Sequence, residues 1–479
     1  MGHWIERRPL LAACALVALT LVAHAVILAA PGFYANDEWQ KFDHIRLHGF
    51  EDFARAYGTI RPGPEFGYPM RPLGFIEQGF AAQWMQSAPW AAHLVGVLNH
   101  ALVALTFVWV LRRAGVAAAT AGLAGVFFVL SPLTTMATGW LAASFDQLYI
   151  LFLLLAAAAI VKLPPGGLSP MRAAWLLLAT AGALLAKETA IVAPGVVLLI
   201  AFMVRSVHPA GFSWRPYGMA FVIALLPVVA YLLFRAPAIA ASLAGHSDAA
   251  YTPDARYAPH NAWRFFAFPF RVKLVQMSAA VFRSPWQPLA AAMAHLLLIV
   301  AVRRMFGPSF AWSYVAGYFI FLVPVLALPN PGVHCLYGAA LAMSLAMAAV
   351  LAQSWSTRRY GLATLVLAGV GALFVHNIVI QRQLFDTGQC QARFLDSVDA
   401  TLAATPAGIV VVPEPDAAAF TRIAIRAVTA REAYIIDGRP IVVVDSSDRR
   451  DAAVPDNGAL RMRMTPACTL RPVSATGSR

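Results

Sequence analysis

The sequence predicts an all-α polytopic membrane protein with about eleven transmembrane helices and a small extracytoplasmic α/β domain at its C-terminus. Two observations support this fold class. Hydrophobic residues make up 60% of the 479-residue chain and charged residues only 12%, against roughly 25% charged residues in an average soluble domain. Long apolar runs recur up to residue 380, and shorter runs between polar segments follow. We therefore expect a transmembrane domain over 1–380 and a separate domain over 381–479.

Each expected transmembrane helix is an apolar run of a length near that of the hydrocarbon core. The first run exceeds the apolar region of a signal peptide, so we favour a retained helix over a cleaved leader. The pair 172–186 and 189–204 is short and indicates a tight hairpin with Lys187 and Glu188 at its tip. The expected spans are 10–30, 92–111, 116–133, 145–162, 172–186, 189–204, 217–234, 285–302, 310–328, 336–353 and 361–380.

Lys and Arg side chains predict the orientation. They gather at one set of helix ends, whereas the short connections 134–144 and 329–335 at the opposite ends have none. The basic ends and the N-terminus are therefore expected in the cytoplasm. The same distribution accounts for the net charge of +13 without a nucleic-acid partner. High Ala, Arg and Pro usage suggests a bacterium, so we expect an inner (plasma) membrane protein with periplasmic loops 31–91 and 235–284 and a periplasmic C-terminal domain.

The first periplasmic loop carries two apolar patterns at helical spacing. Residues 37–57 predict an amphipathic helix lying on the membrane surface. Arg61-Pro62-Gly63-Pro64 ends this pattern, and residues 73–90 resume it as a second interfacial helix. The loop 235–284 has a similar aromatic cluster at Trp263-Arg264-Phe265-Phe266.

The C-terminal segment shows the patterns of a small α/β domain. Gly408–Pro413 and Pro440–Asp445 are Val- and Ile-rich runs typical of short buried strands. Asp396–Ala404 and Ala417–Thr429 have helical spacing.

Cysteine usage leaves two alternatives open in this segment. Cys390 and Cys468 form either a disulfide, as a periplasmic location would permit, or two free thiols. The four cysteines contain no CxxC pair, so neither a zinc site nor a thioredoxin-type site is predicted. No cofactor is predicted. The sequence contains no ligand motif that would support a divalent metal site.

Ionisable and polar residues cluster at the periplasmic helix ends, which favours an active site on that side. A carboxylate in low-dielectric surroundings has a raised pKa and can act as a general base. Lys187 and Arg71 suit an anionic group such as a phosphate. Asp146 opens an apolar run with no basic partner nearby in the sequence. The candidate residues are Asp37, Glu38, Arg71, Asp146, Lys187, Glu188, His334 and Tyr337.

Structural roles compete with chemical ones at these positions. Asp37 and Glu38 would equally cap a surface helix or stabilise its first turn. The two charges at the hairpin tip would form a salt bridge with each other, the interpretation that their spacing alone favours. Arg71 would place its guanidinium among lipid head groups.

Several short motifs, in their order and on their side of the membrane, make the chain resemble the polytopic GT-C glycosyltransferases over about residues 1–380. It is similar to the protein O-mannosyltransferase and tetratricopeptide O-mannosyltransferase-like branch, and to bacterial relatives of the aminoarabinose transferase type. The motifs are Asp37-Glu38 after the first membrane helix, the amphipathic first loop, Arg71-Pro72-Leu73, Asn99-His100, and Ala186-Lys187-Glu188-Thr189 followed by Pro194.

The resemblance implies an inverting transferase that takes a sugar from a polyprenyl-phosphate donor. By this resemblance Asp37 would be the general base that deprotonates the acceptor hydroxyl, and Glu38 would support it. Arg71 and Lys187 would hold the donor phosphate.

Two positions depart from the family pattern. Related chains have an Arg shortly before the Asp of the fourth span, where this chain has Ala143-Ser144-Phe145-Asp146. They have Arg-Tyr-x-Tyr at the start of a late helix, where this chain has His334-Cys335-Leu336-Tyr337. We therefore expect His334 to replace one basic phosphate contact, with Asp146, Glu188 and Tyr337 in supporting positions.

We accordingly expect a glycosyltransferase that moves a sugar from a polyprenyl-phosphate donor to an envelope glycan, lipid or protein acceptor at the periplasmic face. One rival is a transporter or flippase for a polyprenyl-linked glycan. That class should place ionisable residues or broken helices near mid-membrane and show repeat symmetry, and neither is evident in the sequence. A second rival is a non-catalytic envelope-assembly protein.

Overall fold

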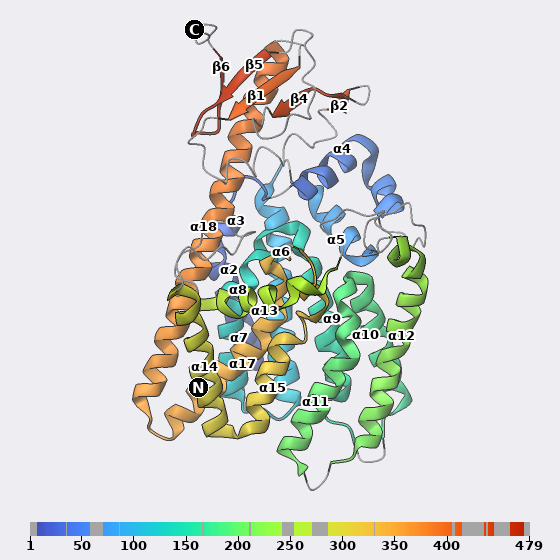
Figure 1. The fold of residues 1–479 in the computed structure, drawn as a ribbon, viewed down its shortest axis with the longest axis vertical. Helices are drawn as coiled ribbons and strands as arrows, with labels where there is room; N and C mark the ends of the chain where they lie inside the picture. Colours follow the sequence, from blue (N-terminus) through green and yellow to red (C-terminus); the bar gives the residue numbers. More distant parts are fainter. Residues whose placement is uncertain are drawn as a thin grey trace.

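Helices build the body of the molecule, and a small sheet stands at one end of it (Figure 1). The helices that follow the first membrane segment, α4 and α5, lie at the same end as the sheet (Figure 1). The expected break at 61–64 and the expected helix 417–429 lie outside the described residues. The computed structural model describes residues 7–34, 36–57, 70–85, 87–164, 167–209, 212–241, 253–270, 286–329, 331–404, 408–413, 435–436, 439–444 and 460–473.

Many of the helices begin with a proline in the first turn, where its fixed φ suits the helix and its missing N–H removes no bond. Three short 3₁₀ segments also matter for the site: η1 (Leu141–Ala143), η2 (Glu188–Val192) and η8 (Val333–Tyr337). The α-helices are α2 Pro9–Ala23, α3 Ala25–Leu28, α4 Asn36–Tyr57, α5 Pro72–Ala82, α6 Pro89–Arg113, α7 Ala118–Leu130, α8 Pro132–Gly139, α9 Phe145–Ile160, α10 Pro170–Ala186, α11 Ala193–Val207, α12 Trp214–Ala241, α13 Ala258–Ala267, α14 Trp286–Phe306, α15 Pro308–Phe319, α16 Val323–Leu326, α17 Ala339–Ser356 and α18 Tyr360–Ala404.

Among the described residues, seven helices are long and apolar enough to cross a membrane, or eight when α7 and α8 are taken as one bent span. Every expected span falls on a helix. However, α2 with 15 residues and α10 with 17 are shorter than a full crossing of about 20 residues. The multi-pass helical architecture is confirmed, whereas the number of about eleven spans stays a prediction.

The expected span 116–133 is bent by 58° between α7 and α8. Pro132 causes the break because it lacks the N–H that would continue the helix. Ser131 starts the next helix, and its side-chain oxygen accepts the N–H of Leu133 at 3.3 Å. The bend redirects α8, which leads into Trp140 and η1 beside the candidate site.

Small residues let the segments of this bundle approach closely, as is typical where lipid competes with protein contacts. A Cβ on Gly182 of α10 would collide with the ring of Phe152 on α9. Gly32 and Gly388 meet backbone to backbone, and a Cβ on either would collide with the main chain of the other. This second contact fixes the segment before α4 against α18.

The interfacial helices of the first loop differ in detail from the expectation. Helix α4 is broken at Gly49, whose φ of +85° lies in the left-handed region that glycine adopts at low cost. The expected helix 37–57 is therefore two shorter helices. Helix α5 ends at Ala82 rather than continuing to residue 90. In the second long loop, α13 contains the aromatic cluster around Trp263.

The C-terminal strands are β1 Ile409–Pro413, β4 Val442–Val444, β5 Leu460–Met464 and β6 Leu470–Pro472, in the sheet order β4-β1-β5-β6. Strand β1 runs parallel to β4 and β5, with Ile409 opposite Val442 and Leu460, and β5 runs antiparallel to β6. A separate antiparallel pair joins β2 Ile435–Ile436 and β3 Arg439–Pro440. These strands confirm the two expected Val-rich strands.

The sheet is joined to the membrane part by α18 itself. This helix has 45 residues and passes the expected domain boundary at residue 380 without a break. Phe394 of α18 shares one buried core with Ile409 of the sheet and with Trp39 of α4. A disulfide joins Cys390 of α18 to Cys468 in the turn before β6, 78 residues later. The disulfide alternative is thus correct.

Candidate active site

A buried ion pair lies at the centre of the candidate site. The Lys187 ammonium donates to both carboxylate oxygens of Asp146, at 2.6 and 2.7 Å. Their side chains are 4% and 1% exposed. Asp146 stands in the first turn of α9, and Lys187 is an extended residue between α10 and η2. The partner that Asp146 lacks nearby in the sequence comes from 41 residues away.

A second ion pair lies beside the first. Arg71, the residue before α5, forms a two-pronged bond with the Glu188 carboxylate; its Nε lies 2.7 Å from Oε2, and its Nη2 bonds Oε1. The guanidinium packs on the ring of Phe145, 4.8 Å from its centroid. Two structural expectations are therefore wrong. Lys187 and Glu188 pair with different partners, and Arg71 binds a carboxylate within the protein instead of extending to lipid head groups.

His334 completes this cluster from η8. Its Nε2 lies 3.9 Å from Oδ2 of Asp146, and its ring meets Trp140 edge to face, with centroids 5.0 Å apart. Gly332 makes room for the imidazole, since a Cβ there would collide with it. In the described part of the chain, His334 Nδ1 and Trp140 Nε1 are buried without a hydrogen-bond partner. Unpaired buried polar atoms are costly, so these two mark a place suited to a bound polar group.

Tyr337 lies deeper in the bundle. Its hydroxyl bonds Nδ1 of His100 at 2.8 Å, and its ring packs edge to face on Phe128, 5.4 Å away. The side chain is fully buried. Tyr337 therefore links η8 to α6 beneath the ion pairs.

Glu38 holds two backbone segments together. Its carboxylate accepts the N–H of Tyr34 at 2.7 Å and the N–H of Leu141 at 2.6 Å. The side chain is 2% exposed. It thereby attaches the start of α4 to η1, which leads directly into α9 and Asp146. Asp37 belongs to the first turn of α4, and its side chain lies outside what the structure describes.

Gln391 reinforces the same region from α18, a role that sequence analysis did not identify. Its side-chain oxygen accepts the N–H of Phe33 at 3.2 Å and Nε1 of Trp39 at 2.9 Å. Its amide nitrogen donates to the carbonyl of Tyr34 at 3.2 Å. The first turn of α4 is therefore positioned by η1 on one side and α18 on the other.

A second buried cation is Lys41 of α4, which sequence analysis did not identify. Its ammonium donates to the Gln78 side chain of α5 and lies 5.4 Å from the ring centroids of both Phe75 and Phe145. Phe145 thus lies next to Lys41 and Arg71 at once. In the sequence, Lys41 lies three residues after Glu38 within an amphipathic pattern, where a lysine is expected to face solvent. Its burial could therefore not be predicted from the sequence.

Glu77 of α5 is a further acid of this region. Asn99 of α6 donates to one carboxylate oxygen, and the Ser144 hydroxyl donates to the other at 3.3 Å. Burial raises the pKa of Glu77 to about 7, and the two hydrogen bonds offset part of that rise. It is the only charged residue between 72 and 90, a signal that sequence analysis could have used.

The cluster brings five of the predicted residues together and leaves their formal charges balanced. Two cations face two carboxylates, and the imidazole of His334 stands beside them. Across the ranges that the structure describes, no three His, Cys, Asp or Glu side chains are placed to hold a metal ion. The arrangement offers fixed cationic donors and the unpaired N–H of Trp140, which suit a bound oxyanion. The five residues are Arg71, Asp146, Lys187, Glu188 and His334.

No protein-family model matches the chain, and no protein of curated function matches it. Among solved structures, the chain is similar to the arabinofuranosyltransferase AftD from Mycobacteria, with a TM-score of 0.45 and 16% identity over 87% of this chain and 30% of that one. It is also similar to the Archaeoglobus fulgidus oligosaccharyltransferase tethered with an acceptor peptide, with a TM-score of 0.44 and 10% identity over 86% and 62% of the two chains.

The apo form of the same oligosaccharyltransferase gives a TM-score of 0.43 and 11% identity over 87% of this chain and 64% of that one. The chain thus spans less than two thirds of each of these proteins. Both are named as transferases of sugars.

Proposed function

We propose that the chain is an integral membrane glycosyltransferase of GT-C type. It would transfer a sugar from a polyprenyl-phosphate donor to an envelope glycan, lipid or protein acceptor at the periplasmic face of a bacterial inner membrane. The observation that carries this proposal is the cluster of the buried Lys187–Asp146 pair and the partly exposed Arg71–Glu188 pair, with the unpaired Trp140 Nε1 and His334 Nδ1 atoms beside it.

The donor phosphate would bind at the cations of this cluster. Asp146 and Glu188 hold the Lys187 ammonium and the Arg71 guanidinium in fixed positions, so little ordering is left for the moment of binding. The phosphate would share these cations with the carboxylates. It would also accept a hydrogen bond from Trp140 Nε1, beside the His334 ring.

The transfer step would be a single displacement. The acceptor hydroxyl oxygen attacks the anomeric carbon, the bond from that carbon to the phosphate oxygen breaks, and polyprenyl phosphate leaves with the bonding pair. Asp37 would take the hydroxyl proton as general base. Glu38 would support Asp37 through the backbone, because its carboxylate fixes the first turn of α4 against η1.

Glu77 is a second candidate for the base. A pKa of about 7 matches the task of accepting a proton near neutral pH. Glu77 also bonds Ser144, two residues before Asp146. A rate that falls sharply for Glu77→Gln and little for Asp37→Asn would move the base assignment from Asp37 to Glu77.

A transfer assay tests the proposal. Full-length protein in lipid vesicles would be given undecaprenyl-phosphate-linked hexoses and pentoses together with envelope glycan, lipid and peptide acceptors, and undecaprenyl phosphate release would be measured. We expect release with at least one donor and a loss of 100-fold or more in Asp37→Asn, a size typical of removing a catalytic base. Glu51→Gln, at an exposed acid of α4 beyond the break at Gly49, is the control.

The rivals predict different results in the same vesicles. A flippase would move labelled lipid between leaflets without releasing undecaprenyl phosphate, and an assembly protein would do neither. The proposed orientation has its own test: Asn36→Cys should react with an impermeant thiol reagent from the periplasm, whereas Arg112→Cys should not. The reverse labelling would overturn the periplasmic placement.

A further inference from the structure

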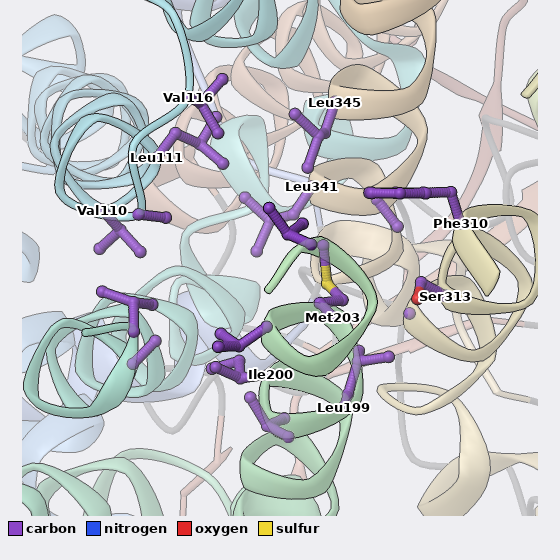
Figure 2. Close-up of a pocket in the computed structure, with 18 of the residues that line it drawn as sticks. Val110, Leu111, Val116, Leu199, Ile200, Met203, Phe310, Ser313, Leu341 and Leu345 are labelled. Atoms are coloured by element: carbon purple, nitrogen blue, oxygen red, sulfur yellow. The ribbon is translucent and has the colours of Figure 1, made fainter. Parts of the chain in front are cut away.

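A large cavity lies in the half of the bundle away from the candidate site. Its volume is about 920 Å³, near the upper end of the roughly 300–1,000 Å³ of small-molecule sites. Side chains of α6, α11, α15 and α17 surround it, as Figure 2 shows for Leu111, Met203, Phe310 and Leu345. The catalytic proposal uses none of these residues.

The cavity has the depth of one membrane leaflet. On α17 its lining runs from Leu341 to Gln353, which is about 18 Å at 1.5 Å per residue. Half of a hydrocarbon core of about 30 Å is about 15 Å. A single extended alkyl chain that enters beside Gln353 would therefore fit the cavity from the leaflet surface to its inner end.

Small residues on facing helices keep this space open. Gly317 of α15 faces α17, and a Cβ on it would lie 3.3 Å from the Cβ of Ala342 and 3.5 Å from Cδ2 of Leu199. Ala346 and Ala349 continue the small face of α17 toward the mouth. Larger side chains at these positions would fill the cavity.

The wall is too apolar to be a water cavity, because buried water needs two to four polar partners. The hydroxyls deep in the wall already have partners. Ser313 donates to the carbonyl of Ser309 at 2.9 Å, and Tyr314 bonds Nδ1 of His295 at 2.9 Å. An empty apolar space would leave its lining without van der Waals contacts. An alkyl chain supplies these contacts without requiring hydrogen bonds.

The mouth of the cavity is basic. Lys162, Arg172 and His208 line it. Arg172 Nη1 donates to the carbonyl of Lys162 at 2.5 Å, which holds the guanidinium beside that lysine. Within the described residues, neither Lys162 nor Arg172 pairs with a carboxylate.

The connections between helices at this end of the bundle contain no acid. They lie within residues 112–117, 161–172, 203–215, 303–310 and 353–360, and none of these five contains Asp or Glu. Two adjacent cations without an acidic neighbour favour an anionic lipid headgroup.

We propose that this cavity is a lipid site that takes one acyl chain of an anionic glycerophospholipid from the leaflet at the basic, cytoplasmic end, with the lipid phosphate bound by Lys162 and Arg172. The chain occupies the space among Leu199, Met203 and Leu345, and the second acyl chain stays in the bilayer. This site is separate from the proposed transfer site, so a failure of either proposal leaves the other standing.

Binding of defined lipids to the delipidated full chain tests the headgroup. Native mass spectrometry would compare phosphatidylglycerol with phosphatidylcholine carrying the same acyl chains. We expect about tenfold tighter binding of phosphatidylglycerol, from two cationic contacts. Lys162→Gln with Arg172→Gln should remove that preference, whereas the control Arg303→Gln with Arg304→Gln should keep it. Arg303 and Arg304 are exposed at the same end but do not line the cavity. Equal binding of both lipids to the unaltered chain would overturn the proposal.

Cavity filling tests the acyl chain. Ala349→Phe should weaken binding of both lipids at least tenfold, whereas Ala368→Phe, at an exposed position of α18, should change nothing. Undiminished binding by Ala349→Phe would overturn the site.

A third measurement uses the unaltered protein and so does not depend on how a variant folds. Phosphatidylglycerol with a photoreactive acyl chain should label peptides of α11 and α17 that contain Met203 and Leu345. Labelling confined to outer faces such as that of α18 would contradict the proposal, as would displacement of the label by undecaprenyl phosphate at equal concentration.

Discussion

The two ends of the bundle differ in whether their cationic side chains are paired with carboxylates. At the candidate site, Arg71 and Lys187 are each held by a carboxylate supplied by another part of the chain. At the opposite end, Lys162 and Arg172 flank a cavity mouth among connections that contain no acid. Paired and buried charges fix geometry, whereas unpaired charges at a membrane surface attract anions. Lys and Arg side chains therefore fix the geometry of the candidate site at one end and are available to bind an anion at the other.

The largest effect should come from breaking the buried pair. Lys187→Met leaves the Asp146 carboxylate buried without a partner, which should lower the free energy of unfolding by about 3–5 kcal/mol. Thermal unfolding of the purified protein measures it. The double variant Asp146→Leu/Lys187→Met should recover most of the stability and still lack transfer activity. Wild-type stability in the single variant would show that the pair does not position this end.

Glu38→Gln should cause the second-largest loss of stability. A glutamine has one carbonyl oxygen, so one of the two N–H groups of Tyr34 and Leu141 would lose its acceptor, at about 1–3 kcal/mol. Denaturant unfolding checks the value against Glu51→Gln, which should stay within about 0.5 kcal/mol of the native protein. An unchanged stability would mean that the start of α4 is held by Gln391 alone.

The pH dependence of stability should reveal Glu77. Its folded pKa of about 7 lies above the ordinary 4.5, so the folded state keeps a proton that the unfolded state has released. Stability should therefore fall as pH rises from about 4.5 through 7, and the loss should be complete above 7. Glu77→Gln should flatten this slope, so that between pH 5 and pH 8 the variant loses about 2–3 kcal/mol less stability than the native protein. A slope equal to that of the native protein would remove Glu77 from the titrating groups.

Arg71→Lys should affect function more than stability. Lysine keeps the charge but cannot form the two-pronged bond with Glu188, and the pair is partly exposed, so we expect a stability loss of at most about 1 kcal/mol. Donor affinity should fall about tenfold if the guanidinium contacts the phosphate. Arg46→Lys is the control for exchanging a partly exposed Arg beside a carboxylate: its Nε lies 3.9 Å from the buried Asp43, and its own side chain is 40% exposed.

The smallest stability change is expected at the opposite end. Lys162→Gln with Arg172→Gln removes no ion pair in the described part of the chain, so unfolding in detergent should shift by less than about 0.5 kcal/mol. The selectivity among lipids should change nonetheless. A large destabilisation without any change in lipid selectivity would show that these cations stabilise the fold, as those of the site do.

Apolar runs made the helical architecture predictable, because about 20 apolar residues have few alternatives in a bilayer. The breaks were less predictable. The bend at Ser131–Pro132 depends on one proline within an otherwise continuous run. The length of α18 was not predicted because its apolar pattern weakens at 380, whereas the backbone stays helical to Ala404.

The partners in the candidate site depend on tertiary structure and could not be read from spacing. Lys187 and Glu188 are neighbours, but Lys187 is extended, with φ −160° and ψ 135°. Successive side chains point in opposite directions in such a backbone, so the two residues face different partners. Glu77 differs, because a lone acid in an apolar interfacial helix is visible in the sequence itself.

The unbroken α18 also connects the basic end of the bundle to the sheet through one continuous helix. Its 45 residues extend about 68 Å at 1.5 Å per residue, more than twice a hydrocarbon core of about 30 Å. The helix begins at the basic end and finishes beneath the sheet, and along its way Gln391 bonds the backbone that leads into α4. A tilt of about 5° at its membrane end would move the far end by about 6 Å over that length. A change in the tilt of α18 would also displace Gln391 and, with it, the backbone that leads into α4.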